Sequence, residues 1–467
     1  MRRASMQATT MLAAVGALAL AGCATNATMS VNPQPKPAPA ATAVQGEAFG
    51  GQQPVVGMSL QLYAAGTSGY GSAATAVFGT PLTTNSNGGF TFPTGWASGC
   101  PTTTSPVYLV GTGGDPVAGN TSNGGSTAAN PQLALAVALG PCNSLNSSTH
   151  IHMNELTTVA AAWALAPFMS GNTTSYLNVG TSSTNTAGLA MAFAAAAQLV
   201  NTSTGTVGGS TLPAGATVPT AEIYSIGNIL EACINSKGGV ANDGTACGTL
   251  FGDTPSSTGY PTDTITAAMN IAQNPGRNVA ALFNIATGTP AFMTPLTSAP
   301  NAWTIAIQYT GGGLNAPTAI AADQSGNIWV ANSASTGTGA VSLFDNLGNS
   351  KLGTTGATIG GTPGGLAIDL NGNGWVTSSN NEVYELTSSG TTTTTLTGNG
   401  LNLPTAIAID PSSNIWLVNS ASGANTVSAF TSAGGTVSGS PFSGAGIAAP
   451  AGIAINGNAN ANCADCH

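Results

Sequence analysis

The chain has 467 residues, of which only 4% are charged, and its formal net charge at pH 7 is −9. Because an ordinary globular protein carries about 25% charged residues, Thr, Ser, Asn and Gly must supply most of this polar surface, and folding stability is expected to depend weakly on pH. With only 6 Lys and Arg residues in the whole chain, there is almost no basic surface, which excludes nucleic acid as a partner.

The N-terminus has the layout of a secretory signal. Arg2 and Arg3 precede a short apolar stretch from Met11 to Leu20, and Cys23 follows soon after. This stretch is shorter than the ~20 residues that a membrane-spanning helix needs. The sequence LAGC, which ends at Cys23, resembles the lipobox of bacterial lipoproteins, and the resemblance implies cleavage before Cys23 and diacylation of its thiol. An ordinary signal peptide that is cut nearby, with an incidental cysteine, is the alternative.

Residues 1–22 are therefore expected to be a lipoprotein signal peptide, followed by a stiff tether rich in Pro and Ala at 23–49. Several acyl chains on one residue anchor a protein stably in a membrane. Ala24 differs from the Asp that resembles an inner-membrane retention signal. The outer membrane or the cell surface is thus the favoured location.

Residues 50–118 are predicted to form a small β-sandwich. Alternating apolar residues begin at Val56, a polar turn follows, and the apolar sequence VYLV closes the set at 107–110. Strand, turn and strand in this order are typical of such a fold. The sequence from Gly89 to Phe92 resembles the start of a strand in transthyretin-like or carboxypeptidase-regulatory modules of extracellular proteins.

Between residues 119 and 298 the apolar residues recur with a helical period, which predicts an Ala-rich α-helical domain. One apolar stripe from Ile223 to Ile234 indicates a helix that starts near Thr220 and ends near Gly238. A second segment, Ala187 to Val200, is apolar on all sides but too short for a membrane span, so a buried helix is expected there. Further helices are expected at Leu133 to Leu139, Glu155 to Ala166, Thr264 to Ala272 and Val279 to Ala286.

One phrase occurs three times in the last third of the chain, starting at Pro317, Pro363 and Pro404. These prolines are 46 and 41 residues apart, a period typical of four-stranded propeller blades, which repeat every ~40–50 residues. A fourth copy starts at Pro450 but loses its Trp. Residues 299–467 are therefore predicted to form a propeller-like array of about four blades. Because propellers close with about 4–8 blades, the array is a minimal ring, an open arc or a truncated propeller.

Two residue types recur at fixed positions of the repeat. The aspartates are expected to close hairpin turns, a role that Asn would fill equally well, and the tryptophans are expected to fill the space between blades. These residues are Asp323, Asp369 and Asp410, and Trp329, Trp375 and Trp416. The array resembles NHL-type repeats of the kind shared by streptogramin lyases and gluconolactonases, over residues 300–467. The resemblance implies a propeller scaffold, a fold that carries many unrelated functions.

Six cysteines remain once Cys23 is assigned to lipid, and an oxidising compartment makes disulfide pairing the default. Cys233 and Cys247 flank a loop rich in Gly and Asn. A bridge that closes about 15 residues stabilises a protein by ~3 kcal/mol in the chain-entropy model. Cys100 and Cys142 are the next plausible pair, and the full connectivity stays open.

The chain ends in CADCH, which matches the attachment pattern of c-type haem at Cys463, Cys466 and His467. Haem also needs an apolar pocket and usually a second axial ligand. Because the motif forms the last five residues and replaces a propeller strand, a small disulfide loop or an unstructured end is favoured over haem.

Two other motifs suggest metal ions, each with a structural alternative. His150, His152 and Glu155 are a candidate zinc set, but Asn154 and Glu155 also suit the cap and first turn of a helix. The sequence DLNGNG from Asp369 opens like a calcium loop, but it lacks the Glu expected at position twelve and aligns with two ordinary hairpin turns. No cofactor is therefore expected.

Whether the propeller is an enzyme depends on a general base. The resemblance implies a central cluster of His or of Glu, Asp and Asn, but residues 300–466 have no His, and their only Glu residues are Glu382 and Glu385. The sequence favours a surface-anchored, non-catalytic lipoprotein that presents the propeller for binding an extracellular protein or glycan. The alternatives are a lactonase-like hydrolase or lyase and, less favoured, a haem protein that transfers electrons.

Overall fold

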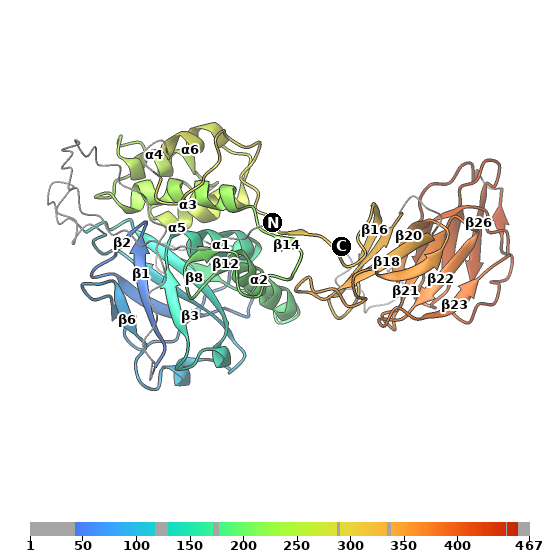
Figure 1. Cartoon of the computed structure of the whole chain (residues 1–467), viewed down its shortest axis with the longest axis horizontal. Helices are drawn as coiled ribbons and strands as arrows, with labels where there is room; N and C mark the ends of the chain where they lie inside the picture. Colours follow the sequence, from blue (N-terminus) through green and yellow to red (C-terminus); the bar gives the residue numbers. More distant parts are fainter. Residues whose placement is uncertain are drawn as a thin grey trace, which may run out of the picture.

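A computed structural model describes residues 43–116, 129–170, 177–286, 290–333, 338–444 and 446–455. Figure 1 shows an N-terminal body of sheets and helices beside a C-terminal array of sheets. The lipidation candidate Cys23 and the haem-like motif Cys463, Cys466 and His467 lie outside the described residues. Within them, no helix combines the length and the apolar character of a membrane span.

One sheet of the N-terminal body is built around β1. This strand pairs in parallel with β9, so that Gln45 lies opposite His150 and Ala48 opposite Met153. Every second residue of β1 is buried, which explains why residues 45–49 form a strand instead of the last part of the expected tether. The strands of this sheet are β1 (Gln45–Gly50), β2 (Gln53–Pro54), β6 (Gly89–Thr91) and β9 (His150–Met153).

The second sheet shows that the expected helix at Leu133 to Leu139 is wrong. The segment forms β8, which pairs along its length with β7. A short apolar run has the same pattern in a buried strand and in a buried helix. Here the hydrogen bonds to β7 hold the segment as a strand. The predicted domain boundary at 118 therefore falls inside one sheet. Its strands are β3 (Ser59–Ala64), β4 (Thr75–Ala76), β5 (Leu82–Thr83), β7 (Pro106–Thr112) and β8 (Ala134–Pro141).

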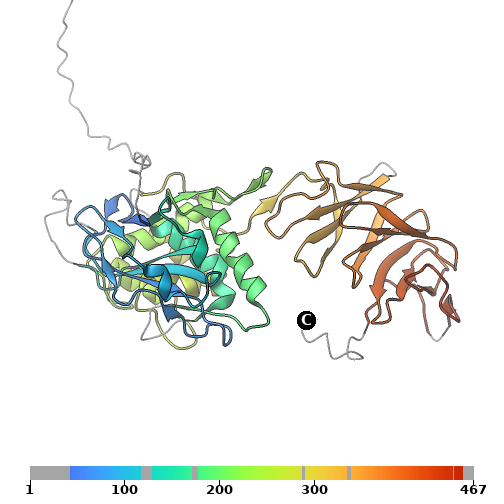
Figure 2. The ribbon, with the colours of Figure 1, turned by 90° about the horizontal axis from the view of Figure 1, so that it is seen from below.

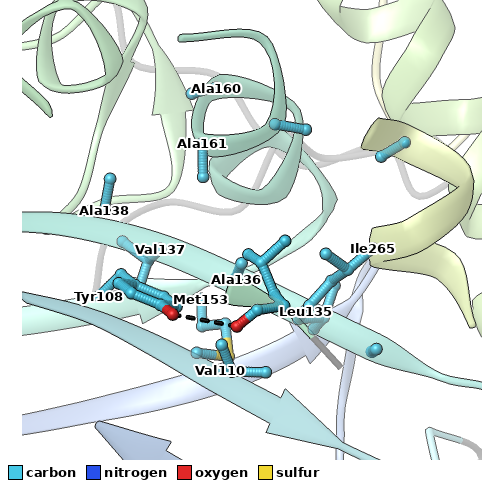
Figure 3. Packing of buried hydrophobic residues seen from close by; sticks show 14 of the residues in the cluster. Tyr108, Val110, Leu135, Ala136, Val137, Ala138, Met153, Ala160, Ala161 and Ile265 are labelled. Carbon is cyan, nitrogen blue, oxygen red and sulfur yellow. Dashed lines mark hydrogen bonds between the residues drawn. The ribbon is translucent and has the colours of Figure 1, made fainter. Parts of the chain in front are cut away.

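Six helices in the described part share one hydrophobic core with these sheets. Helix α1 packs on β8 and against α2, α3 and α5, and Figure 3 shows Ala161 of α1 above Val137 and Ala138 of β8. Small side chains at these positions let helix and sheet approach closely. The helices are α1 (Glu155–Leu165), α2 (Thr186–Leu199), α3 (Thr220–Ile234), α4 (Ala246–Asp253), α5 (Thr264–Gln273) and α6 (Val279–Ile285).

Helix α2 is buried on one face only, where Leu189, Phe193 and Ala196 contact the core. The expected helix is therefore present, but it is buried on one side only, because the alanines on its other face are half-buried or exposed. Four short strands follow or precede the helices and form hairpins: β10 (Met169–Ser170), β11 (Asn178–Val179), β12 (Val200–Asn201) and β13 (Thr206–Val207).

Two disulfides close the N-terminal body. One joins Cys100 to Cys142 at the end of β8, and the other joins Cys233 of α3 to Cys247 of α4. Both are the pairings that the sequence favoured. Each bridge closes a loop in the chain and so reduces the conformational entropy of the unfolded state.

The C-terminal array consists of three antiparallel four-stranded sheets, named blades 1, 2 and 3 in chain order. Both views in Figures 1 and 2 show them following one another away from the N-terminal body. The first strand of each blade contacts the first strand of the next, which is the arrangement of an arc of propeller blades. The fourth copy of the repeat has no strand in its described residues, 450–455.

The three blades have equivalent strands. Blade 1 holds β16 (Pro317–Ala322), β17 (Ile328–Asn332), β18 (Thr338–Phe344) and β19 (Ala357–Gly360). Blade 2 holds β20 (Pro363–Ile368), β21 (Gly374–Ser378), β22 (Glu382–Leu386) and β23 (Thr392–Leu396). Blade 3 holds β24 (Pro404–Ile409), β25 (Ile415–Asn419), β26 (Thr426–Phe430) and β27 (Phe442–Ser443). Before them, β14 (Ala216–Thr217) pairs with β15 (Gln308–Tyr309) where the chain leaves the N-terminal body.

The repeated tryptophans couple neighbouring blades. Trp329 of blade 1 is fully buried against Val376 and Leu386 of blade 2, and its ring lies so close to Gly374 that an added Cβ would meet it at 2.8 Å. Trp375 of blade 2 is buried in the same way against blade 3. The two interfaces between blades are thus built around an indole from the preceding blade.

Removing these indoles should have unequal effects. Trp329→Ala is expected to destabilise the array by ~3–5 kcal/mol, because it leaves a cavity between two blades. Trp416→Ala should cost about half as much, since Trp416 is only half-buried and stacks on Phe442 at 5.5 Å between ring centroids. Urea unfolding followed by circular dichroism measures both. Equal losses in the monomeric chain would contradict the role of the next blade in covering the indole.

Candidate functional site

The open face of blade 1 is the candidate binding site. It is the face that points away from blade 2, and it is built from Ile320, Ile328, Val330 and Phe344, which lie opposite one another across β16, β17 and β18. These four residues line a cavity of about 620 Å³, together with Tyr309 and other residues. Ile320 is 71% exposed. Ile328 is half-buried, and Val330 and Phe344 are only 6% and 7% exposed. The apolar surface available to a partner is therefore the cavity itself, with Ile320 exposed beside it.

The same positions are covered in the other two blades. Leu366, Val376 and Leu386 of blade 2 pack beneath Trp329. Their counterparts in blade 3 pack beneath Trp375 and are Ile407, Ile415, Leu417 and Phe430. The face of blade 1 therefore has the chemistry of a blade interface, but no blade lies against it in the part of the chain that the structure describes.

The N-terminal body contacts blade 1 without closing this face. Gln198 of α2 donates a hydrogen bond from Nε2 to the backbone oxygen of Leu347 at 2.6 Å and accepts one from the hydroxyl of Tyr309 at 3.2 Å. Leu347 belongs to the turn between β18 and β19, at one end of the sheet. Within the lining of the cavity, Asp345 at this turn is the one charged side chain. The site is thus apolar, with a single carboxylate at its edge.

The repeated aspartates hold the turns that lead into the tryptophan strands. Oδ1 of Asp323 accepts hydrogen bonds from the backbone NH groups of Ser325 and Asn327, as expected for a hairpin turn. Its Oδ2 accepts from Nε1 of Trp329 at 3.1 Å. The carboxylate therefore also fixes the indole, a function that the sequence analysis missed because the partner lies six residues away.

The other two copies repeat this geometry. Asp369 accepts from Trp375 Nε1 at 3.1 Å, and Asp410 accepts from Trp416 Nε1 at 2.9 Å. Asp369 also accepts from two backbone NH groups of its turn, so DLNGNG has the hydrogen bonds of a hairpin. Burial opposes ionisation of Asp323, but the hydrogen bonds from Asn327, Trp329 and Ser325 outweigh it and lower the pKa of this carboxyl.

The glutamates of the propeller are engaged by neighbouring side chains. Glu385 accepts hydrogen bonds from Asn373, Thr393 and Thr394. Glu382 accepts from Asn380 and Tyr384. Neither lines the cavity on blade 1. A general base at the open face would therefore have to be Asp345, whose pKa is lowered by hydrogen bonds from Asn349 that outweigh its burial.

The structure does not assemble the zinc set proposed from His150, His152 and Glu155. Both histidines instead face Oε1 of Glu47 on β1, at 3.8 Å and 3.0 Å, and hydrogen bonding to them lowers the pKa of Glu47 to about 2. No group of three or more His, Cys, Asp or Glu in the described ranges could hold a metal ion. Glu47 lay in the predicted tether, so its pairing with β9 could not be anticipated.

Glu155 has a structural position at the start of α1. Asn154 caps the helix, as the alternative interpretation held, and Glu155 is buried, with Oε1 accepting from the NH of Gly51 at 2.8 Å. Burial, together with the charge of Glu231, raises the pKa of Glu155 to about 8. A single buried carboxyl can thus make stability depend on pH despite the sparse charge of the surface.

Comparisons with known proteins find little. No family model and no curated protein sequence matches the chain. Among solved structures, virginiamycin B lyase from Staphylococcus aureus is 19% identical over 26% of this chain and 39% of its own, with a TM-score of 0.20. A catalytically inactive form of that lyase with quinupristin is 16% identical over 32% and 47% of the two chains, with a TM-score of 0.24. The chain thus spans less than half of these neighbours, and a likeness at this level carries no functional argument.

Asn should not replace Asp in the turns that bind an indole. Asp323→Asn is expected to cost ~1–3 kcal/mol. An amide has only one acceptor oxygen, so if this oxygen serves the two backbone NH groups, the amide NH2 faces the NH of Trp329 and that hydrogen bond is lost. Asp345→Asn is the matched control, since its turn binds backbone NH groups and Asn349 but has no tryptophan partner. Thermal melting of both variants should show the larger loss for Asp323→Asn. Equal losses of stability in the two variants would show that Asp323 acts only by closing its turn.

Folding stability should fall as the pH rises from about 4.5 toward 8. In this window Glu155 ionises in the unfolded chain while burial keeps it protonated in the folded chain, whose pKa is about 8. The stabilisation is complete below the pKa of Glu155 in the unfolded chain. It is lost as the pH passes the pKa of Glu155 in the folded chain, a change on the order of 4 kcal/mol in the free energy of unfolding. Glu155→Gln should flatten the dependence. Urea unfolding at pH 5 and pH 8 measures it, and a wild-type stability that stays constant would refute this assignment.

Proposed function

We propose that this chain is an exported, lipid-anchored, non-catalytic protein that holds a propeller-like scaffold outside the cell and binds another protein through the open face of blade 1. The observation that carries this proposal is the apolar cavity of about 620 Å³ on blade 1, with Ile320 71% exposed beside it. Two disulfides and the secretory layout of the N-terminus support export.

The chemistry of the face favours a protein over a glycan. Its four strand residues are aliphatic or aromatic, and Asp345 is the one charged side chain in the lining. Sugars are bound through many polar contacts, whereas the centre of a protein interface is apolar and poor in charge. The partner should therefore present an apolar or aromatic surface.

A binding role also fits the state of the acidic groups. Glu382 and Glu385 are occupied by hydrogen bonds from side chains of their own blade, and hydrogen bonds hold Asp323 in its turn. General-base catalysis needs a carboxylate that can reach a substrate proton. The three turn aspartates instead stabilise the scaffold.

The anchor depends on one cysteine. Metabolic labelling with palmitate should mark the wild-type chain and leave Cys23→Ser unlabelled and released from membranes, because the proposed acyl acceptor is removed. Cys100→Ser is the control, since that cysteine serves a disulfide. A Cys23→Ser chain that remains labelled and membrane-bound would rule out this anchor.

Protein docking at blade 1 can be tested in intact cells with a photo-crosslinking amino acid. Placed at Ile320, it should form an adduct with another polypeptide, which mass spectrometry then identifies. The same amino acid at Leu370 is the control, because Leu370 is similarly exposed at 66% but lies on a turn of blade 2. Absence of any protein adduct at 320, or equal adducts at both sites, would contradict the proposed function.

A further inference from the structure

We propose that the partner of blade 1 is blade 3 of a second copy of this chain, so that two arcs of three blades form one six-bladed ring. The inference rests on the proposed function, because it names the occupant of the open face. It follows from the two ends of the arc, which carry the complementary halves of an interface that the chain already forms twice.

The receiving half is the open face of blade 1. In the two internal interfaces, the equivalent face accepts an indole: Val376 and Leu386 lie under Trp329, and Ile415 and Leu417 lie under Trp375. Register places Ile328 and Val330 of blade 1 at the same positions as Ile415 and Leu417 of blade 3. Blade 1 therefore presents a surface of the type that receives a tryptophan, and the described residues place no blade before it.

The donating half is the far face of blade 3. Trp416 is held by Asp410 in the orientation of the two preceding indoles, yet it is only half-buried, with Phe442 stacked beside it. Opposite Trp416 on β26 lies Ala429, where blade 2 has the charged Glu385. At this position beside the indole, the outward face of blade 3 is apolar, whereas the corresponding position of blade 2 carries a charge.

A second copy satisfies both halves at once. A contact between two different faces closes into a ring or continues as an open filament. Six blades lie within the ~4–8 at which propellers close, and in a closed pair both ends of each arc of described blades are covered. The N-terminal body contacts the turn at Leu347 and leaves Ile320 71% exposed, so it does not occupy the position of the incoming blade.

Sedimentation of the full chain tests this inference, with Cys23→Ser in every variant to remove the acylation candidate. Wild type and the control Leu370→Asp should have twice the monomer mass at micromolar concentration. Ile320→Asp should be monomeric because it places a charge in the receiving face, and Trp416→Ala should be monomeric because it removes the donor. An equimolar mixture of these two monomers should form a dimer again, since each supplies the face that the other lacks.

The outcomes separate the inference from the proposed function. Melting curves show whether a variant is folded; if Trp416→Ala is not, Val427→Asp replaces it on the same face of blade 3. A monomeric wild type, a dimeric Ile320→Asp or a series of larger assemblies would overturn the ring. If the photo-adduct at 320 contains a different protein, the second copy is excluded while the binding role stands. An adduct with blade 3 peptides of the same chain, in a dimer that Ile320→Asp abolishes, supports both.

Discussion

The fold of the C-terminal half depends on one interaction, the burial of an indole from each blade against the sheet of the next. Trp329 shows its parts: the ring lies on Gly374, and its Nε1 donates to Asp323. The apolar ring supplies the burial, and the carboxylate fixes the ring so that its polar edge is not left unpaired. Because each blade is covered by the one before it, the first blade has an open face and the last has a partly open tryptophan. Both the proposed docking and its partner follow from this asymmetry.

The N-terminal body uses a different solution for a chain with few charges. Its sheets and helices share one core, and uncharged side chains satisfy buried backbone groups, as when Thr264 and Thr158 bond to β8. The few ionisable groups that are present therefore act locally. Glu47 is held between two histidines, and Glu155 is buried at a helix start with a pKa near 8. Sparse charge thus concentrates pH dependence in a few groups instead of removing it.

The sequence predicted the parts of the fold that follow from local periodicity. The repeat located the first two strands of each of the three blades, and the apolar stripe on α3 located that helix to within a few residues at each end. Contacts between segments that are distant in the sequence could not be predicted in this way. The strand β8 has a pattern that helices share, and Glu47 meets the histidines only because β1 pairs in parallel with β9. The turn aspartates were recognised, but their bond to the indole depends on how the hairpin folds back. The open face was hidden for the same reason, since Ile320 has the same pattern as its covered counterparts.

Hydrogen exchange of the Trp329→Ala variant tests most directly whether the indole couples neighbouring blades. The account predicts faster amide exchange in β20 and β21 of blade 2, across the interface from the substitution, with β25 and β26 of blade 3 less affected. Trp329 contacts blade 2 directly and is separated from blade 3 by an intact interface around Trp375. Exchange that accelerates only within blade 1, while β20 and β21 keep their wild-type protection, would contradict the central role of the tryptophan.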